Sequence, residues 1–223
     1  MTHDLQVLHI ERRPRSKRLA VHLSDGQTLS LTPDVAATLR ITSGGTLTGS
    51  RLEEINRSQS REDALAAALR LIAFRPRSEN EMRQALGRRG IPQDVRDETV
   101  SRLRELALLD DAAFAVSFIE TRDRSSPRSR RLLAQELRQK GIARETASRS
   151  ADTVDDADAA YRAAGRRAGA MRGLPFPDFE RRLGGFLLRR GFSYETTRAT
   201  VRRLWGEKGE QAGEESLIPP DSP

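Results

Sequence analysis

Arginine is the side chain whose number and clustering in this sequence suggest chemistry, and that chemistry is the binding of anions. Arg75 and Arg77 flank Pro76 in one expected turn between helices, and a larger cluster occupies the equivalent turn about 50 residues later. Guanidinium groups at such turns can reach phosphate oxygens. The candidate contact residues are Arg75, Arg77, Arg122, Arg124, Arg128, Arg130, Arg131, Lys140, Arg166 and Arg167.

Other cations have a structural explanation. Arg88-Arg89, Arg138, Lys140 and Arg189-Arg190 precede expected helix ends, where the helix dipole favours positive charge. We interpret these residues mainly as helix-end cations, and Lys140 belongs to both groups. The aromatic residues fall at the spacing of core positions, so a platform for stacking bases is not indicated.

The residues needed for catalysis are not found together. Asp110 and Asp111 are adjacent at an expected helix start, where they do not face one point and are better explained as a cap. The histidines, His3, His9 and His22, lie in the first 50 residues, and no acid or cysteine completes a metal-ligand set. No Walker phosphate-binding loop and no cysteine occur. We therefore predict a binding protein without catalytic, cofactor-binding or metal-binding residues.

The charge distribution favours an anionic partner. The 223-residue chain carries a net charge of +7, but the segment after residue 205 carries −4, which leaves +11 on the rest. Such a charge favours nucleic acid first, although a solvated arginine-rich surface would give the same total. No signal peptide or apolar run of about 18 residues is seen, so we expect a soluble, cytoplasmic protein. We also expect it to be a monomer.

An internal repeat positions the arginine clusters. An apolar segment, two basic residues and a glycine recur, with the glycines at Gly90, Gly141 and Gly191, separated by 51 and 50 residues. Helical periodicity from residue 64 to 205 divides each repeat into three helices. The expected repeats are 61–109, 110–155 and 156–205, followed by a disordered acidic tail at 206–223. We expect a mainly α fold in which tandem three-helix repeats form an elongated curved body.

The residues before the repeats predict a different structure. Leu19, Val21 and Leu23 alternate with other residues, and Asp25-Gly26 is a hairpin signal. A small β-rich module at 1–55 is therefore expected, joined to the first repeat by a polar connector at 51–61.

Two further boundaries are predicted from cap residues. Ser78, with Glu81 three positions later, forms a capping box that starts the second helix of the first repeat. Ser126-Pro127 is interpreted as the corresponding start in the second repeat, with proline at the first helical position.

Four segments of the sequence resemble the RecX family of regulators of the RecA recombinase. They are Arg75-Pro76-Arg77-Ser78-Glu79, Leu109-Asp110-Asp111-Ala112-Ala113-Phe114-Ala115, Gln135-Glu136-Leu137-Arg138-Gln139-Lys140-Gly141-Ile142 and Leu188-Arg189-Arg190-Gly191-Phe192. The resemblance covers about residues 61–205 and implies tandem three-helix repeats. Ser129 stands where family members usually have glycine, and the β-rich module is absent from many members.

The resemblance implies a function in homologous recombination, DNA repair and the SOS response. A protein of this family would bind the RecA–ssDNA filament along its groove, inhibit ATP hydrolysis and strand exchange, and bind DNA alone weakly and in a salt-dependent way. Two alternatives stay open: a DNA-binding or transcriptional regulatory protein that does not need RecA, and a helical scaffold for a protein partner.

Overall fold

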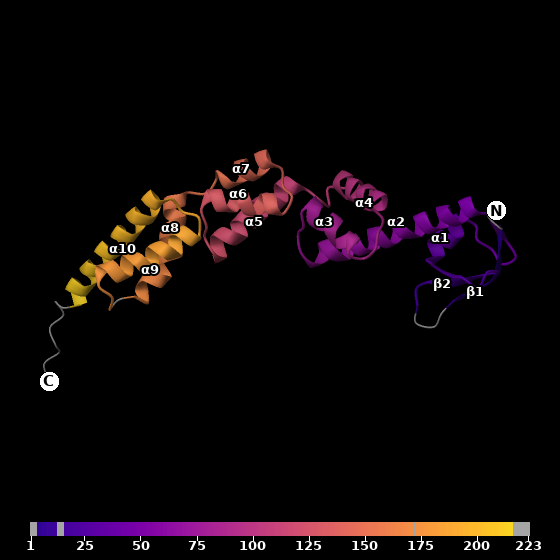
Figure 1. Ribbon diagram of the computed structural model, residues 1–223, viewed down its shortest axis with the longest axis horizontal. Helices are drawn as coiled ribbons and strands as arrows, with labels where there is room; N and C mark the ends of the chain where they lie inside the picture. Colours follow the sequence, from indigo (N-terminus) through magenta and orange to yellow (C-terminus); the bar gives the residue numbers. More distant parts are fainter. Residues whose placement is uncertain (1–3, 13–15, 172, 216–223) are drawn as a thin grey trace, which may run out of the picture. The chain divides into compact units, whose positions relative to one another are not determined.

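The chain is mainly helical and begins with a small antiparallel sheet (Figure 1). The computed structural model describes residues 4–12, 16–171 and 173–215. They fall into two compact units, an N-terminal unit, Met1–Leu109, and a C-terminal unit, Asp110–Pro223. None of the described helices combines the length and the apolar character that crossing a membrane requires.

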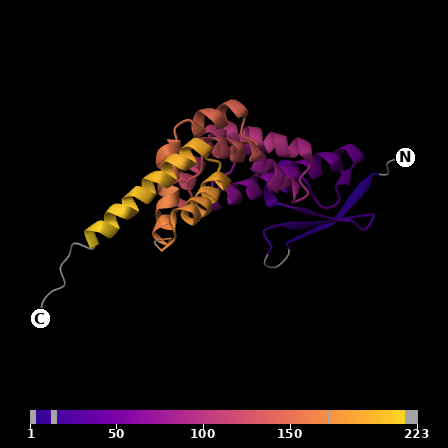
Figure 2. The ribbon, with the colours of Figure 1, turned by 60° about the vertical axis from the view of Figure 1, so that its left-hand side comes forward.

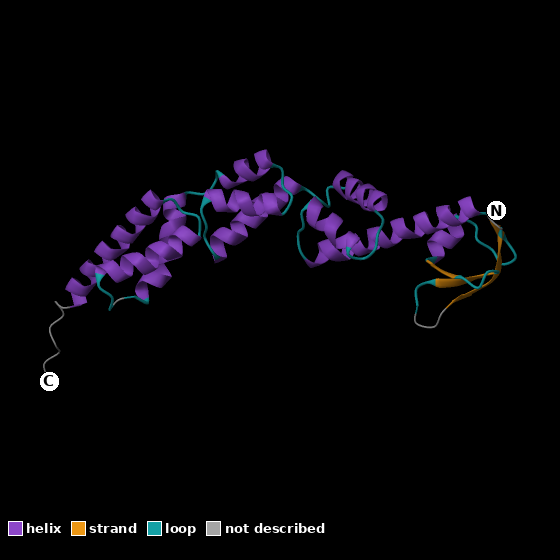
Figure 3. Cartoon of the chain, in the orientation of Figure 1, coloured by secondary structure: helices purple, strands orange, loops and turns teal. Residues whose placement is uncertain are grey.

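The N-terminal unit starts with the β-rich module that the sequence predicts. Strands β1 (Leu5–Arg12), β2 (Leu19–Leu23), β3 (Thr28–Leu31) and β4 (Thr46–Leu47) form an antiparallel sheet in the order β3-β2-β1-β4. Figure 3 draws the strands in orange, apart from the purple helices. Gly26 has φ +85° in the turn between β2 and β3, a conformation that favours glycine. The predicted hairpin is therefore confirmed.

One expectation about this module is wrong. We predicted that no acid completes a ligand set with the histidines, but the carboxylate of Glu11 lies beside the rings of His9 and His22. The sequence alone does not indicate this acid, because it does not show how β1 pairs with β2 and so brings these side chains together. His3 lies outside the described residues.

Helix α2 (Gly49–Phe74) joins the sheet to the first three-helix domain, after the short helix α1 (Pro33–Thr38). Ile55 packs in the core under the sheet, whereas Ala64 packs with the helices that follow. The prediction of a polar connector at 51–61 is wrong, because these residues are helical and the expected boundary lies inside α2. Figure 2, in a turned view, again shows the sheet beside this helix.

The first three-helix domain consists of the second half of α2, α3 (Glu79–Gly87) and α4 (Gln93–Glu105). Oγ of Ser78 accepts a hydrogen bond of 3.1 Å from the main-chain N–H of Glu81, as the predicted helix start requires. Gly90 has φ +77° after α3, which confirms the predicted helix end.

The C-terminal unit contains two further sets of three helices. The first set is α5 (Asp111–Ser125), α6 (Arg130–Gln139) and α7 (Arg144–Ala151). The second set is α8 (Asp156–Gly169), α9 (Phe176–Arg189) and α10 (Tyr194–Glu215). One continuous apolar core joins all six helices, with Leu133, Leu137, Phe179 and Leu187 among its fully buried side chains.

Two sequence predictions about the ends of these helices are wrong. Helix α6 does not start at Ser126-Pro127, because Ser126 ends α5. Ser129 is the cap of α6, since its Oγ accepts a hydrogen bond of 3.2 Å from the main-chain N–H of Leu132. The acidic tail was expected to be disordered from residue 206, but α10 continues to Glu215. The rest of the predicted tail, 216–223, lies outside the described residues.

The predicted cap at the start of α5 is confirmed and provides a stability test. Oδ1 of Asp110 accepts hydrogen bonds from the main-chain N–H groups of Ala112 and Ala113 at 2.7 and 3.0 Å. We expect Asp110→Ala to lower the free energy of unfolding by about 1 kcal/mol. Urea denaturation followed by circular dichroism measures the loss, and Glu120→Ala, an exposed change on the same helix, is the control. An equal loss in both variants would contradict the role of the cap.

Candidate nucleic-acid interface

Four guanidinium groups line one cleft in the C-terminal unit. The cleft has a volume of about 350 Å³ and lies where the end of α5 and the α5–α6 turn meet α8 and the end of α9. We call it the arginine cleft. Its lining residues are Arg124, Ser125, Ser126, Pro127, Arg162, Ala163, Arg166 and Arg190.

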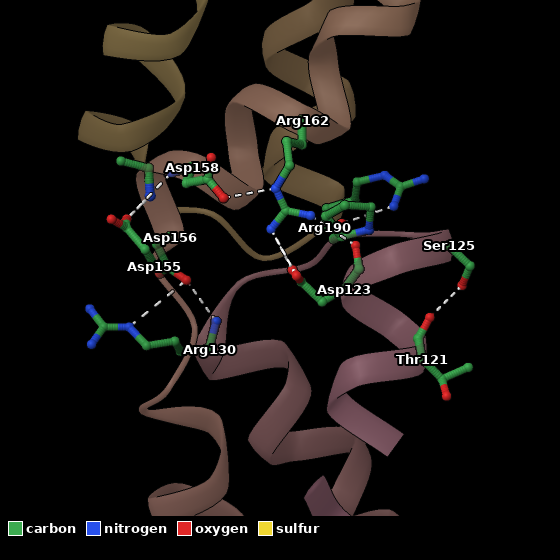
Figure 4. Close-up of polar contacts among 11 residues, drawn as sticks. Thr121, Asp123, Ser125, Arg130, Asp155, Asp156, Asp158, Arg162 and Arg190 are labelled. Atoms are coloured by element: carbon green, nitrogen blue, oxygen red, sulfur yellow. Dashed lines mark hydrogen bonds and ion pairs between the residues drawn. The ribbon is translucent and has the colours of Figure 1, made fainter. Parts of the chain in front are cut away.

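Arg162 holds two walls of the arginine cleft together. Its Nη2 donates to both carboxylate oxygens of Asp123 on α5, at 2.7 and 2.9 Å, and its Nε donates to Asp158 on its own helix at 2.7 Å (Figure 4). The hydrogen bonds to Asp123 and then Asp158 raise the pKa of Arg162 above its ordinary value. Because two acids already neutralise this guanidinium, we assign Arg162 to positioning α8 against α5.

Arg190 brings a charge to the other side of the cleft that no carboxylate among the described residues compensates. Its Nη1 donates to Oγ of Ser126 at 2.8 Å and to the carbonyl oxygen of Pro127 at 3.0 Å, both neutral acceptors. Its guanidinium also lies 4.5 Å from the centre of the Phe186 ring. Burial lowers the pKa of Arg190 below its ordinary value, and the nearby charge of Arg167 lowers it further. An anion in the cleft would favour the charged form of Arg190 and so offset both effects.

Arg124 and Arg166 complete the set. Both side chains are exposed, and within the described part of the chain no carboxylate lies within 4.0 Å of either guanidinium. Arg166 follows Arg162 by one helical turn on α8, which puts the two on the same face. Counting only the residues that the structure describes, the cleft therefore presents three cations without a carboxylate partner to one small volume, from Arg124, Arg166 and Arg190.

The predicted candidates of the N-terminal unit are engaged within their own turn. Nη1 of Arg75 lies 2.8 Å from Oε2 of Glu81, and Nε of Arg77 donates to the carbonyl oxygen of Leu71 at 3.3 Å. Burial lowers the pKa of Arg77, and the neighbouring charge of Arg75 adds to this effect. These contacts support a structural role for both side chains.

Three candidates of the C-terminal unit are paired with acids. Arg122 and Arg128 both contact the carboxylate of Glu136 on α6, Arg122 through Nε at 3.4 Å. Nε of Arg130 lies 3.9 Å from Oδ1 of Asp156 (Figure 4). The same oxygen accepts a hydrogen bond of 2.8 Å from the main-chain N–H of Arg130. These pairs hold the start of α6 in place, so less of their charge is available to a ligand.

Of the remaining candidates, Lys140 and Arg167 lie against aromatic rings, and Arg131 is exposed away from the arginine cleft. Nζ of Lys140 lies 5.4 Å from the centre of the Phe118 ring, and the guanidinium of Arg167 lies 4.7 Å from that of Phe186. Both are cation–π contacts that cover the core. Arg131 is exposed on α6 and does not line the arginine cleft.

Comparison with known proteins gives a consistent assignment. Family models for the first, second and third three-helix domains of RecX match residues 64–103, 110–149 and 154–201. The chain belongs to the RecX family. The sequence resemblance is thus confirmed, as is the mainly α fold of three three-helix domains preceded by a small sheet.

Individual RecX proteins match over most of their length. Regulatory protein RecX of Streptomyces coelicolor is 35% identical over 171 residues, which are 75% of this chain and 91% of that protein. Regulatory protein RecX of Enterococcus faecalis is 30% identical over 198 residues, or 87% and 74% of the two chains. A crystal structure of regulatory protein RecX covers 87% of this chain and 97% of its own, with a TM-score of 0.62 and 22% identity. The match to a crystal structure of RecX from Lactobacillus salivarius covers 66% of this chain and 97% of that one, with a TM-score of 0.58 and 21% identity. These two structures support the fold.

The arginine cleft joins two of the RecX three-helix domains. Arg124 belongs to the second domain and Arg162, Arg166 and Arg190 to the third. The sequence predicts Arg124 and Arg166 as candidates, but not Arg162 or Arg190. Helical spacing gave a signal for Arg162, four residues before Arg166. For Arg190 there was no such signal, because its surroundings depend on how α9 packs against the α5–α6 turn.

Proposed function

We propose that this protein binds the RecA–ssDNA filament and down-regulates RecA by inhibiting ATP hydrolysis and strand exchange during recombination and DNA repair. We further propose that it acts as a monomer in the cytoplasm and that the arginine cleft contacts DNA phosphates. Membership of the RecX family supports the partner. The mode of contact is supported by the three cations of the cleft, which have no carboxylate partner in the part of the chain that the structure describes.

The chemistry of the cleft favours phosphates over bases. Phosphate contacts position a protein on DNA without reading its sequence, whereas base recognition in single strands uses exposed aromatic rings. Phe186, the ring beneath Arg167 and Arg190, is buried in the core. We therefore expect binding that is independent of sequence and weakens with salt.

A titration of the RecA ATPase on single-stranded DNA tests the proposal. Added protein should inhibit ATP hydrolysis fully at well below one copy per RecA. The protein alone should bind the same DNA weakly, with a slope of log K against log salt near about −2 for three phosphate contacts. Undiminished hydrolysis at equimolar protein would reject the RecA assignment. Tight binding to a particular duplex sequence without RecA would instead support a transcriptional regulator.

A further inference from the structure

Three metal-ligating side chains meet on the N-terminal sheet, away from the arginine cleft. His9 and Glu11 lie on β1 and His22 lies on β2, where His9 and His22 are paired across the two strands. One ligand atom from each residue can be chosen so that all three atoms lie within 4.8 Å of one another. The three side chains are exposed or half-buried, so an ion can reach them from solvent.

An irregularity in β1 puts these residues on one face. The pairing of β1 with β2 shifts register between Val7 and His9. Val7 is buried, and both Leu8 and His9 are exposed, so the strand departs from simple alternation there. Such bulges re-aim side chains. After the bulge, His9 and Glu11 are two residues apart and share the outer face, beside His22.

The distance between two of the ligand atoms already fits the coordination sphere of zinc, and the third ligand atom lies within 4.8 Å of both. Nε2 of His22 lies 3.4 Å from Oε1 of Glu11. Zinc bonds of about 2.0–2.1 Å in a tetrahedron place neighbouring ligand atoms roughly 3.3–3.4 Å apart. Nδ1 of the same ring lies 3.1 Å from Oγ1 of Thr28. In the tautomer that carries its proton on Nδ1, the ring donates a hydrogen bond to that hydroxyl, and the lone pair of Nε2 faces the carboxylate. Metal-binding histidines are commonly arranged in this way.

We propose that His9, Glu11 and His22 form a binding site for a divalent first-row transition-metal ion, with Zn²⁺ as the test ion. Two imidazoles and one carboxylate provide three ligands and leave the fourth position to water. The His9 and His22 rings are stacked, with centres 4.3 Å apart and an angle of 11° between their planes. A metal lies in the plane of each imidazole that binds it, so binding must tilt the rings apart. The exposure of His9 leaves room for this movement.

Calorimetric titration of the full-length chain, without an affinity tag and after treatment with EDTA, tests the site. Zinc chloride should bind at one ion per chain. His22→Ala and Glu11→Gln should each weaken binding by at least about ten-fold, because each removes one of only three ligands. The control Glu53→Gln removes an equal charge from an exposed position on α2 and should bind zinc as the unchanged chain does.

A second measurement separates loss of the site from loss of the fold. Co²⁺ in place of Zn²⁺ should give the strong visible absorption of a tetrahedral site with nitrogen and oxygen ligands, and His9→Ala should abolish it. Thermal unfolding in EDTA should be the same for the unchanged chain and Glu11→Gln. No zinc binding, or equal binding in His22→Ala and the unchanged chain, would overturn the proposal. Neither result depends on RecA.

Discussion

The double variant Arg124→Glu/Arg166→Glu should bind single-stranded DNA at least about ten-fold more weakly and lose most of its inhibition of the RecA ATPase. Charge-assisted hydrogen bonds are each worth about 1.5–3 kcal/mol, and about 1.4 kcal/mol corresponds to ten-fold in affinity. The slope of log K against log salt should become less steep by about 1.4, since two phosphate contacts are removed. Filter binding over a range of salt concentrations measures both values.

The same charge change elsewhere provides the control. Arg198 and Arg202 are exposed on α10, one helical turn apart, and neither lines the arginine cleft. Arg198→Glu/Arg202→Glu lowers the net charge by the same amount without touching the arginine cleft. If both double variants weaken DNA binding equally, the effect is one of total charge and the cleft has no special role. Circular dichroism should show unchanged helicity in both.

Arg162 is unsuitable for this test because it is needed to hold two helices together. Its contacts with Asp123 and Asp158 join α8 to α5, so its loss would leave both acids without a partner. An effect of its substitution on DNA binding would mix lost charge with a displaced helix. Arg124 and Arg166 have no acid partner among the described residues and can be changed with little expected effect on stability.

The helical repeats could be predicted from the sequence because their signals are local. The glycines near 50-residue spacing and the caps at Ser78 and Asp110 act within a few residues of themselves. Residues 51–61 were misassigned because their helix is polar and depends on distant contacts. Gln59, for example, is buried, and its Oε1 accepts a hydrogen bond of 2.7 Å from the main-chain N–H of Thr32.

The candidate site was predictable only in part, for the same reason. The sequence identifies clusters of arginine, but not which of them an acid neutralises. Glu136 lies on α6. It contacts Arg122, which lies on α5, and Arg128, which lies in the α5–α6 turn. Such pairing depends on how helices pack. It removes most of the predicted cluster from the candidate surface and leaves the arginine cleft.

Gly191→Ala should lower the free energy of unfolding of the C-terminal unit by about 2–5 kcal/mol. Gly191 has φ +86°, and a side chain in this left-handed region costs about 1–2 kcal/mol. A Cβ there would lie 2.8 Å from Cβ of Leu132 and 2.6 Å from Oγ of Ser129. Overpacking of this kind costs about 1–3 kcal/mol more. The main-chain N–H of Ser129 also donates to the carbonyl oxygen of Arg190 at 3.1 Å, so the clash falls where α9 meets the α5–α6 turn.

Trp205, the single tryptophan, lies in this unit and reports its unfolding in urea through fluorescence. The matched control is Gly165→Ala in α8, where a Cβ meets no atom within 4 Å. That change should raise stability by about 0.4–1 kcal/mol, because alanine reduces the entropy of the unfolded chain. Opposite signs from the same chemical change would establish that Gly191 is needed for close approach of the second and third domains. A loss below about 1 kcal/mol would show that the turn relaxes, and Arg190 would then not be held firmly in the arginine cleft.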